Sequence, residues 1–189
     1  MPDTTSPSNQ SLASFTIGAV GHRNLADLEH AIVRQIAFVL RQLIDEHPNE
    51  RLSLLSSAAE GADRLLLATA AELGLPYDCV LPCSPECFRV DFASPDSRGE
   101  FDRLLETARS VMHPEMPFDK EEGYLWASEA VLARADTLLA VWDGGSGNGA
   151  AGTAETVARA RKRGIPVIWI PTEPPHTVQV LEPGVGTAR

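Results

Sequence analysis

Short runs of apolar, β-branched residues recur along the chain and lack the polar alternation of a half-exposed strand. Runs of this kind are typical of strands that are buried on both faces of a parallel sheet. The expected strands are Phe15–Val20, Leu52–Ser57, Tyr77–Leu81, Asp136–Val141 and Ile165–Ile170, with Val111–Met112 as a further short candidate.

Between these runs, apolar residues recur at the spacing of amphipathic helices. The clearest stripe runs from Leu28 to Leu43, with Asn24 or Asp27 as its candidate N-cap. Further helices are expected over 62–73, 96–108 and 124–135, and in the Ala-rich segment that follows Gly152. Strands that alternate with helices predict an α/β fold of the doubly wound, Rossmann-like kind: one mainly parallel sheet with helices on both faces, in a single domain.

The Rossmann-like domain should span residues 15–171. Residues 1–14 are rich in Ser, Thr and Pro and predict a disordered N-terminal tail, whereas 172–189 predict an extended or flexible C-terminal tail. Residues 84–123 have dense charge and weak periodicity. Two interpretations stay open for them: a lid over a ligand site, or a plain surface connection.

In such a sheet, ligands bind beyond the carboxyl ends of the strands, where the strand order reverses. Three loops should meet there. The last is a Gly-rich turn between a strand and a helix, which presents backbone N–H groups at a helix N-terminus. The candidate ligand-binding residues are Gly21, His22 and Arg23 in the first loop, Ser57, Glu60, Gly61 and Asp63 in the second, and Asp143, Gly144, Gly145, Gly152 and Thr153 in the third.

Each charged candidate has a functional and a structural interpretation. The guanidinium of Arg23 matches a phosphate, but it can equally pair with Asp27 on the surface. His22 is a donor or general acid near neutral pH, or a structural imidazole. Glu60 and Asp63 accept from ligand hydroxyl or amino groups, or they stabilise the start of their helix through its dipole.

Glu155 follows the candidate N-cap Thr153 and falls in the first turn of the Ala-rich helix. A carboxylate beside a glycosidic carbon stabilises an oxocarbenium ion or attacks it, so Glu155 is the candidate catalytic residue. The structural alternative is a carboxylate matched to the helix dipole. With phosphate drawn to Arg23 and sugar to the carboxylates, the expected ligand is a nucleotide or a ribosyl phosphate.

The chain has 189 residues, 43% of them hydrophobic, and a formal net charge of −10. An acidic chain without a basic stripe argues against nucleic acid as the main partner. No apolar run is long enough to span a membrane, and the N-terminus lacks the features of a signal peptide, so we expect a cytoplasmic protein. The ligand should be a small molecule, and no cofactor is required.

Three cysteines, Cys79, Cys83 and Cys87, are an odd number that suits a reducing compartment. Their spacing matches no common zinc pattern, and Pro82 and Pro85 interrupt any helix that would align them. We therefore expect small buried thiols and no metal site.

The segments GHR, SSAAEGADRLLLATAAELG and YLWASEAVLARADTLLAVWDGGSGNGAAGTAETVARARKRGIPVIWI together resemble the SLOG superfamily of Rossmann-like nucleotide-binding domains. The middle segment is similar to the S-x-A-x-G-x-D pattern of the bacterial DNA-processing branch. Ser57, Ala59, Gly61 and Asp63 match that pattern, and Ala58 stands where the branch usually has Gly. The resemblance covers roughly residues 15–170 and implies binding of a nucleotide or a nucleotide-derived ligand.

The third loop also resembles the GGxGTxxE segment of LOG-type phosphoribohydrolases and the similar segment of nucleoside deoxyribosyltransferases. Here Glu155 comes one position early, and Thr156 stands where those enzymes have Glu. Our first interpretation is therefore a domain that binds or senses a nucleotide, and the alternative is an N-glycosidic hydrolase or transferase that uses Glu155. An interaction module without a ligand stays open, as does a homo-oligomer formed through helix faces such as Val131–Leu132.

Overall fold

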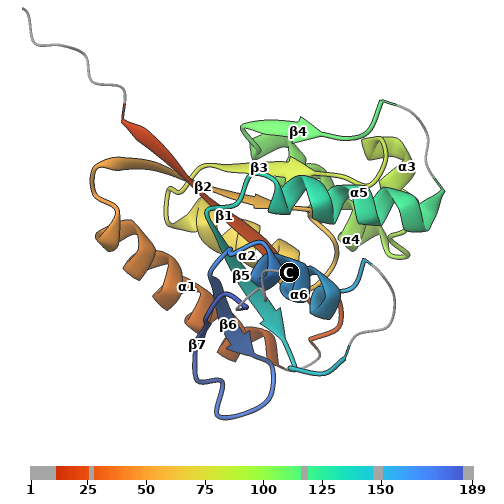
Figure 1. Ribbon diagram of the computed structural model, residues 1–189. Helices are drawn as coiled ribbons and strands as arrows, with labels where there is room; N and C mark the ends of the chain where they lie inside the picture. The colour runs from red at the N-terminus through yellow and green to blue at the C-terminus, as the bar shows by residue number, and fades with distance from the viewer. Residues whose placement is uncertain (1–11, 26–27, 116–118, 147–150, 185–189) are drawn as a thin grey trace, which may run out of the picture.

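A computed structural model describes residues 12–25, 28–115, 119–146 and 151–184. Seven strands form one sheet in the order β4-β3-β2-β1-β5-β6-β7, parallel except for the β6–β7 pair (Figure 1). The strands are β1 (Ala13–Gly21), β2 (Glu50–Ser56), β3 (Tyr77–Val80), β4 (Ser110–Met112), β5 (Thr137–Trp142), β6 (Val167–Pro171) and β7 (Gln179–Leu181). The predicted α/β class and the mainly parallel sheet are confirmed.

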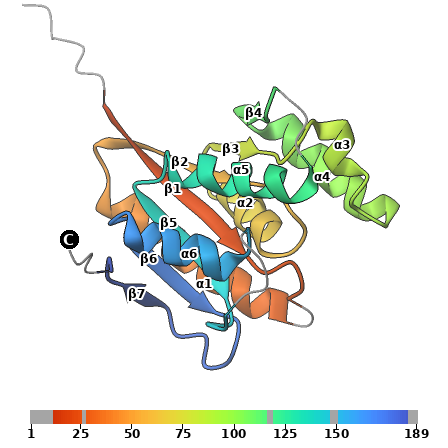
Figure 2. The ribbon, with the colours of Figure 1, turned by 45° about the vertical axis from the view of Figure 1, so that its right-hand side comes forward.

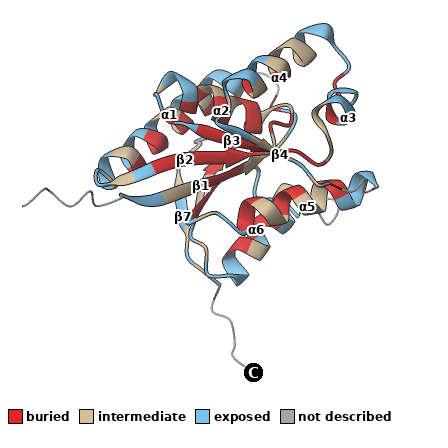
Figure 3. Ribbon diagram, turned by 90° about the horizontal axis from the view of Figure 1, so that it is seen from above, coloured by how far each residue is buried: buried red, intermediate tan, exposed pale blue. Residues whose placement is uncertain are grey.

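Helices cover both faces of the sheet. They are α1 (Glu29–Glu46), α2 (Ala62–Glu72), α3 (Pro85–Arg89), α4 (Pro95–Thr107), α5 (Lys120–Leu132) and α6 (Thr153–Lys162). The helices α1, α2 and α4 lie on one face and α5 and α6 on the other, side by side in Figure 2, with the buried strands between the two layers (Figure 3).

The apolar core has two parts, one on each face of the sheet. On the first face, Ile32, Ile36 and Leu40 of α1 are fully buried in a cluster that also contains core residues of β1, β2 and β6. On the second face, Val131 of α5 and Val157 of α6 are buried in a cluster that also contains Leu138 of β5. The strand order reverses between β1 and β5, so this sheet has its switch point at the carboxyl ends of those two strands.

Several element boundaries differ from the sequence-based prediction. Strand β1 begins at Ala13, inside the predicted tail, because its backbone pairs with β2 from Ala13↔Glu50 onward, beyond the apolar run. Helix α1 has Leu28 at its N-cap and no side-chain cap, while Asp27 lies outside the described residues. Part of the predicted flexible C-terminal tail forms β7, an antiparallel edge strand.

The segment 84–123 is largely built into the domain. It supplies α3, α4 and β4, and β4 extends the sheet beside β3. Phe88, Phe92 and Phe101 are almost completely buried and form edge-to-face or tilted pairs. A plain surface connection is therefore the wrong description of this segment.

The cysteines also depart from the prediction of three thiols. Cys83 and Cys87 form a disulfide across a Cα–Cα distance of 5.9 Å, and only Cys79 is a free thiol among the described residues. The prolines permit this pairing because Ser84 caps the short helix α3 and Pro85 occupies its first position, where no backbone N–H is needed. Burial raises the pKa of the Cys79 thiol to about 12.

Candidate functional site

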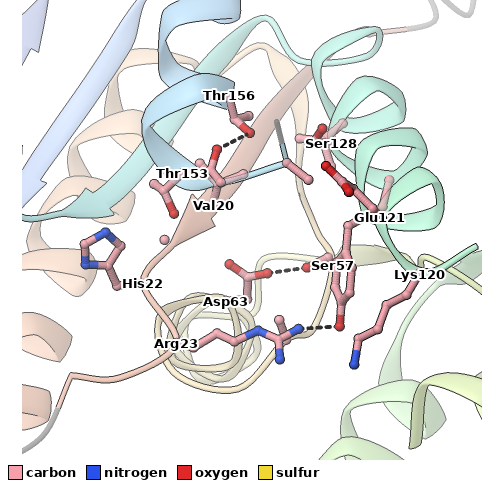
Figure 4. A pocket seen from close by; sticks show the side chains of 17 residues that line it. Val20, His22, Arg23, Ser57, Asp63, Lys120, Glu121, Ser128, Thr153 and Thr156 are labelled. Carbon is pink, nitrogen blue, oxygen red and sulfur yellow. Dashed lines mark hydrogen bonds between the residues drawn. The ribbon is translucent and has the colours of Figure 1, made fainter. Parts of the chain in front are cut away.

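A cavity of about 800 Å³ opens at the switch point of the sheet (Figure 4). Its walls come from the end of β1, the start of α2, one side of α5 and the first turn of α6. The volume lies within the usual range of small-molecule sites, roughly 300–1,000 Å³. The predicted residues that line it are Gly21, His22, Arg23, Ser57, Asp63, Gly152 and Thr153.

Two glycines let the first and second loops approach each other closely. A Cβ at Gly21 would overlap the Ala62 side chain and lie 2.6 Å from the Val141 carbonyl oxygen. Gly61 has a φ of +84°, and a Cβ there would overlap the Arg23 carbonyl oxygen. The Ala62 N–H donates to the His22 carbonyl oxygen at 3.0 Å and joins the loops. Gly61 therefore acts through this close backbone packing and does not line the cavity.

Asp63 is a buried carboxylate at the floor of the cavity. It accepts hydrogen bonds from the Ser57 hydroxyl and the Ala59 backbone N–H. Burial raises its pKa to about 6, although these donors and the nearby Arg23 partly offset the rise. A carboxyl group with this pKa changes its protonation state within reach of neutral pH.

Ala58, next to Ser57, has a φ of +56°. This left-handed conformation is costly for residues with a Cβ, and Gly adopts it readily. The position is the one where the DNA-processing branch usually carries Gly. Ala58 thus adopts a conformation that Gly, the residue the resemblance implies here, would adopt at lower cost.

A chain of polar contacts borders the cavity on the α5 side. Arg23 donates to the Tyr124 hydroxyl, and its guanidinium lies 5.1 Å from the centre of the Tyr124 ring. The Tyr124 hydroxyl donates to Asp91 at 2.7 Å, and Lys120 Nζ donates to the other Asp91 oxygen at 2.9 Å. In the described residues Arg23 thus contacts Tyr124, while the alternative partner Asp27 lies outside them.

The pKa values of this chain of contacts follow from burial and hydrogen bonding. Burial raises the pKa of Tyr124 to about 12, helped by the hydrogen bond to Asp91. Burial alone would raise the pKa of Asp91, but the hydrogen bonds from Lys120 and Tyr124 lower it overall. Asp91 is therefore an anion that is already held by a cation and a phenol at the edge of the cavity.

The first turn of α6 places Thr156, and not Glu155, against the cavity. Gly152 occupies the N-cap, where Thr153 was predicted, and no side chain caps the helix. Thr156 is buried and donates to the Gly152 carbonyl oxygen at 3.0 Å. Glu155 is exposed and accepts from Arg159 Nε at 3.0 Å on the outer face of the helix. One position along a helix turns a side chain by about 100°, which separates the two residues.

The start of the Gly-rich loop folds away from the cavity. The Gly145 N–H donates to Asp143 Oδ1 at 2.8 Å, and the Gly145 carbonyl accepts from Trp142 Nε1 at 2.9 Å. His22 Nε2 lies 3.8 Å from Asp143 Oδ1. Asp143, Gly144 and Gly145 are consequently not among the cavity-lining residues, and 147–150 lie outside the described residues.

Glu60 faces a second, more open groove of about 670 Å³. Its carboxylate accepts from the Ser97 hydroxyl of α4, and Arg64 donates to the Ser97 hydroxyl at 2.8 Å. The contact with Ser97 of α4 explains why Glu60, which lies just before α2, does not reach the cavity.

Helix α5 contributes most of the lining that the sequence did not reveal. Its first turn is held by a capping box in which Asp119 accepts from the Glu122 N–H and Glu122 accepts from the Asp119 N–H. The pattern D-x-x-E at 119–122 is a signal that places this helix start correctly. The polar lining residues missed from the sequence are Lys120, Glu121, Tyr124, Ser128 and Thr156.

The described residues were also compared with what a metal site and a membrane-spanning helix require. Within the described ranges, no group of three or more His, Cys, Asp or Glu side chains is placed to hold a metal ion. In the same part of the chain, no helix combines the length and apolar character needed to cross a membrane.

The fold resembles solved structures of low sequence identity. DNA processing protein A from Helicobacter pylori aligns with 18% identity over 87% of this chain and 69% of its own, with a TM-score of 0.57. The protein of that name from Streptococcus pneumoniae aligns with 14% identity over 86% of this chain and 52% of its own, with a TM-score of 0.60. The protein TM1055 aligns with 15% identity over 81% and 72% of the two chains, with a TM-score of 0.51.

These likenesses support a Rossmann-like fold. No protein-family model matches the sequence, and no curated protein matches it either. The present chain spans about half the length of the Streptococcus pneumoniae protein.

The comparison corrects the expectation that nucleic acid is not a partner. The Helicobacter pylori protein has a binding mode for single-stranded DNA. The net charge of −10 therefore does not exclude nucleic acid for a domain of this fold. The physical reason is that a single strand of DNA is bound by the basic side chains at its own binding surface. The net charge of a protein does not say where on the surface those side chains lie.

Proposed function

We propose that the chain is a SLOG-type domain whose cavity binds a nucleotide or a nucleotide-derived ligand. The observation that carries this proposal is that one cavity holds both cations and a buried carboxylate. Arg23 and Lys120 supply cations on the α5 side, while the buried Asp63 lies at the floor. A nucleotide presents matching groups, since its phosphate is anionic and its sugar hydroxyls donate to a carboxylate.

The remaining walls fit the other parts of such a ligand. The ring of Tyr124 offers an aromatic surface for a base, and apolar side chains such as Val20 and Val131 line the space beside it. The uncapped N-terminus of α6, with the Thr153 side chain beside it, supplies donors for a second polar or anionic group.

The same chemistry occurs in a free nucleotide and in the end of a single strand of DNA. Both carry a phosphate, a sugar and a base, and the cavity is open to solvent on the side of the exposed Arg23 and Lys120. The experiment therefore includes both sources. The hydrolase alternative gains no support, because Glu155 pairs with Arg159 outside the cavity-lining residues.

The test measures two quantities for each added probe. These are the change in the melting temperature of the protein and the Kd from calorimetry. The probes are nucleoside 5′-monophosphates, the nucleosides, ribose 5-phosphate, inorganic phosphate and a short single-stranded oligonucleotide. A ligand at about 100 times its Kd stabilises the folded state by ~2.7 kcal/mol, a rise of roughly 5–10 °C for a chain of this size. The nucleosides should give a smaller rise than their monophosphates.

Variants at the cationic side identify the phosphate contact. Arg23→Ala and Lys120→Ala should each weaken binding of the monophosphate at least tenfold and leave binding of the nucleoside nearly unchanged. Arg41→Ala, which removes an exposed arginine of α1, is the matched control and should behave as wild type. If none of the probes, the oligonucleotide included, raises the melting temperature of the wild-type protein, the proposal is wrong.

A further inference from the structure

We propose that Cys83 and Cys87 form a reversible thiol–disulfide site, and that reducing it releases Asp91 so that a phosphate can reach Lys120 and Arg23. The inference rests on the proposed function of the cavity. It assigns a chemical modification site, with small dithiols and disulfides as its reactants, to a segment that contributes nothing to the cavity lining itself.

The position of the pair suits thiol exchange. Cys87 is exposed and Cys83 is partly exposed, so an attacking thiolate can reach the sulfur atoms. Cys79 is completely buried in β3. Exchange chemistry is therefore directed to Cys83 and Cys87.

Both ends of the bridged segment are in contact with α5. Pro82, immediately before Cys83, lies so close to the helix that a Cβ on Gly123 would be 2.5 Å from the Pro82 carbonyl oxygen. One residue after Cys87, the ring of Phe88 packs edge-on against Tyr124 with centroids 5.9 Å apart. A change in the bridge is thus transmitted to the cavity wall through direct contacts.

The same segment carries Asp91. The Asp91 N–H donates to the Phe88 carbonyl oxygen at 3.0 Å, which fixes Asp91 relative to the end of α3. Its carboxylate accepts from both Lys120 and Tyr124. A ligand phosphate that approaches Lys120 must compete with this carboxylate, because both are anions that need the same donor.

Reduction of the Cys83–Cys87 disulfide weakens the competition between Asp91 and a ligand phosphate for Lys120. A dithiol donates two electrons and two protons, the bond between the two sulfur atoms breaks, Cys83 and Cys87 become thiols, and the reductant leaves as its own disulfide. The segment 83–87 then loses a covalent restraint, and Asp91 is held less firmly on Lys120. The oxidised protein is the low-affinity form and the reduced protein is the high-affinity form.

The test compares binding in the two redox states. Adenosine 5′-monophosphate is titrated into full-length protein treated with dithiothreitol or with glutathione disulfide, and inorganic phosphate serves as a second probe. Reduction should tighten binding about tenfold, within the usual 5–150-fold range of coupled sites. The Cys83→Ser/Cys87→Ser variant should bind like the reduced protein in either buffer.

Asp91→Asn separates this mechanism from a general loosening of the domain. The amide oxygen still accepts from Tyr124 but carries no charge, so the variant should bind tightly in both states, with a ratio of affinities near one. A wild-type protein with equal affinity in both states overturns the inference. So does a tenfold ratio that persists in Asp91→Asn.

A measurement without ligand separates failure of this inference from failure of the proposed function. Hydrogen exchange of the α5 amides from Lys120 to Tyr124 should be faster in the reduced protein, because the contacts with Asp91 and Phe88 are weaker. If neither state binds any probe of the full panel, the oligonucleotide included, the proposed function is wrong, and the hydrogen-exchange result alone decides on the present inference. Faster exchange then supports the coupling between the bridge and α5, and equal exchange overturns it.

Discussion

The charge on Asp63 should make the stability of this domain depend on pH in a way that one substitution removes. Asp63 is 5% exposed, and the pKa of its carboxyl group is raised from 3.8 to about 6, chiefly by burial. A raised pKa means that the folded state binds the proton more tightly than the unfolded state does. Stability therefore falls as the pH rises from the unfolded pKa to the folded one.

The size of the effect follows from the two pKa values. Between 3.8 and about 6, the folded state is protonated at Asp63 while the unfolded state is not. On going from about pH 7.5 to about pH 4.5, protonation of Asp63 should raise the free energy of unfolding by roughly 2 kcal/mol. Other groups titrate over the same range, so the comparison needs a variant in which this one contribution is absent.

Asp63→Asn provides that comparison, because its amide oxygen can still accept from Ser57 but does not titrate. Urea unfolding of both proteins at several pH values gives the two free energies of unfolding. The wild-type value minus the variant value should rise by roughly 2 kcal/mol from about pH 7.5 to about pH 4.5. If the difference between the two free energies of unfolding instead stays constant with pH to within about 0.5 kcal/mol, the raised pKa of Asp63 is refuted.

Two predictions concern backbone positions, and circular dichroism during urea unfolding measures both. Ala58→Gly relieves ~1–2 kcal/mol of left-handed strain but adds chain entropy and removes a buried methyl, so stability should change by less than about 0.5 kcal/mol. Ala70→Gly in α2 lacks that relief and should cost about 2 kcal/mol. Gly123→Ala should cost ~1–2 kcal/mol because its Cβ meets the Pro82 carbonyl. Gly99→Ala in α4 has room and should stabilise by up to ~1 kcal/mol. Equal effects within either pair would contradict the reasoning.

The buried strands and the loops after them could be predicted because they depend on local pattern alone. The run Phe15–Val20 is apolar at almost every position, which a two-sided burial requires, and β1 indeed lies at the centre of the sheet. The switch-point rule then placed Gly21 and Arg23 at the cavity without knowledge of any contact. In contrast, the extension of β1 to Ala13 depends on pairing with β2 and leaves no trace in hydropathy.

The contribution of α5 could not be predicted from periodicity. One side of this helix faces the sheet and another faces the cavity, so its apolar residues form no single stripe. Tyr124 illustrates the difficulty, because it is half-buried between Phe88 and the cavity. Only the capping pattern at 119–122 marks the start of the helix, and a cap says nothing about which neighbour the following side chains meet.

The disulfide and the place of Glu60 depend on contacts that a one-dimensional pattern does not contain. An odd number of cysteines fits a reducing compartment, yet the pairing of Cys83 with Cys87 requires only that a short turn bring two Cα atoms together. Glu60 lies beside Gly61 in its loop but meets Ser97, which is 37 positions away in sequence.

The one-residue difference at the start of α6 bears most directly on what the cavity can do. Thr156 is buried at the position that faces the cavity, and its hydroxyl is already bonded to the Gly152 carbonyl. A hydroxyl held in this way neither attacks an anomeric carbon nor stabilises a positive charge as a carboxylate would. Among the described residues, the carboxylates that line the cavity are Asp63, which Ser57 and Ala59 already engage, and Glu121, which is exposed on α5. The donors and acceptors therefore favour holding a ligand over cleaving its glycosidic bond.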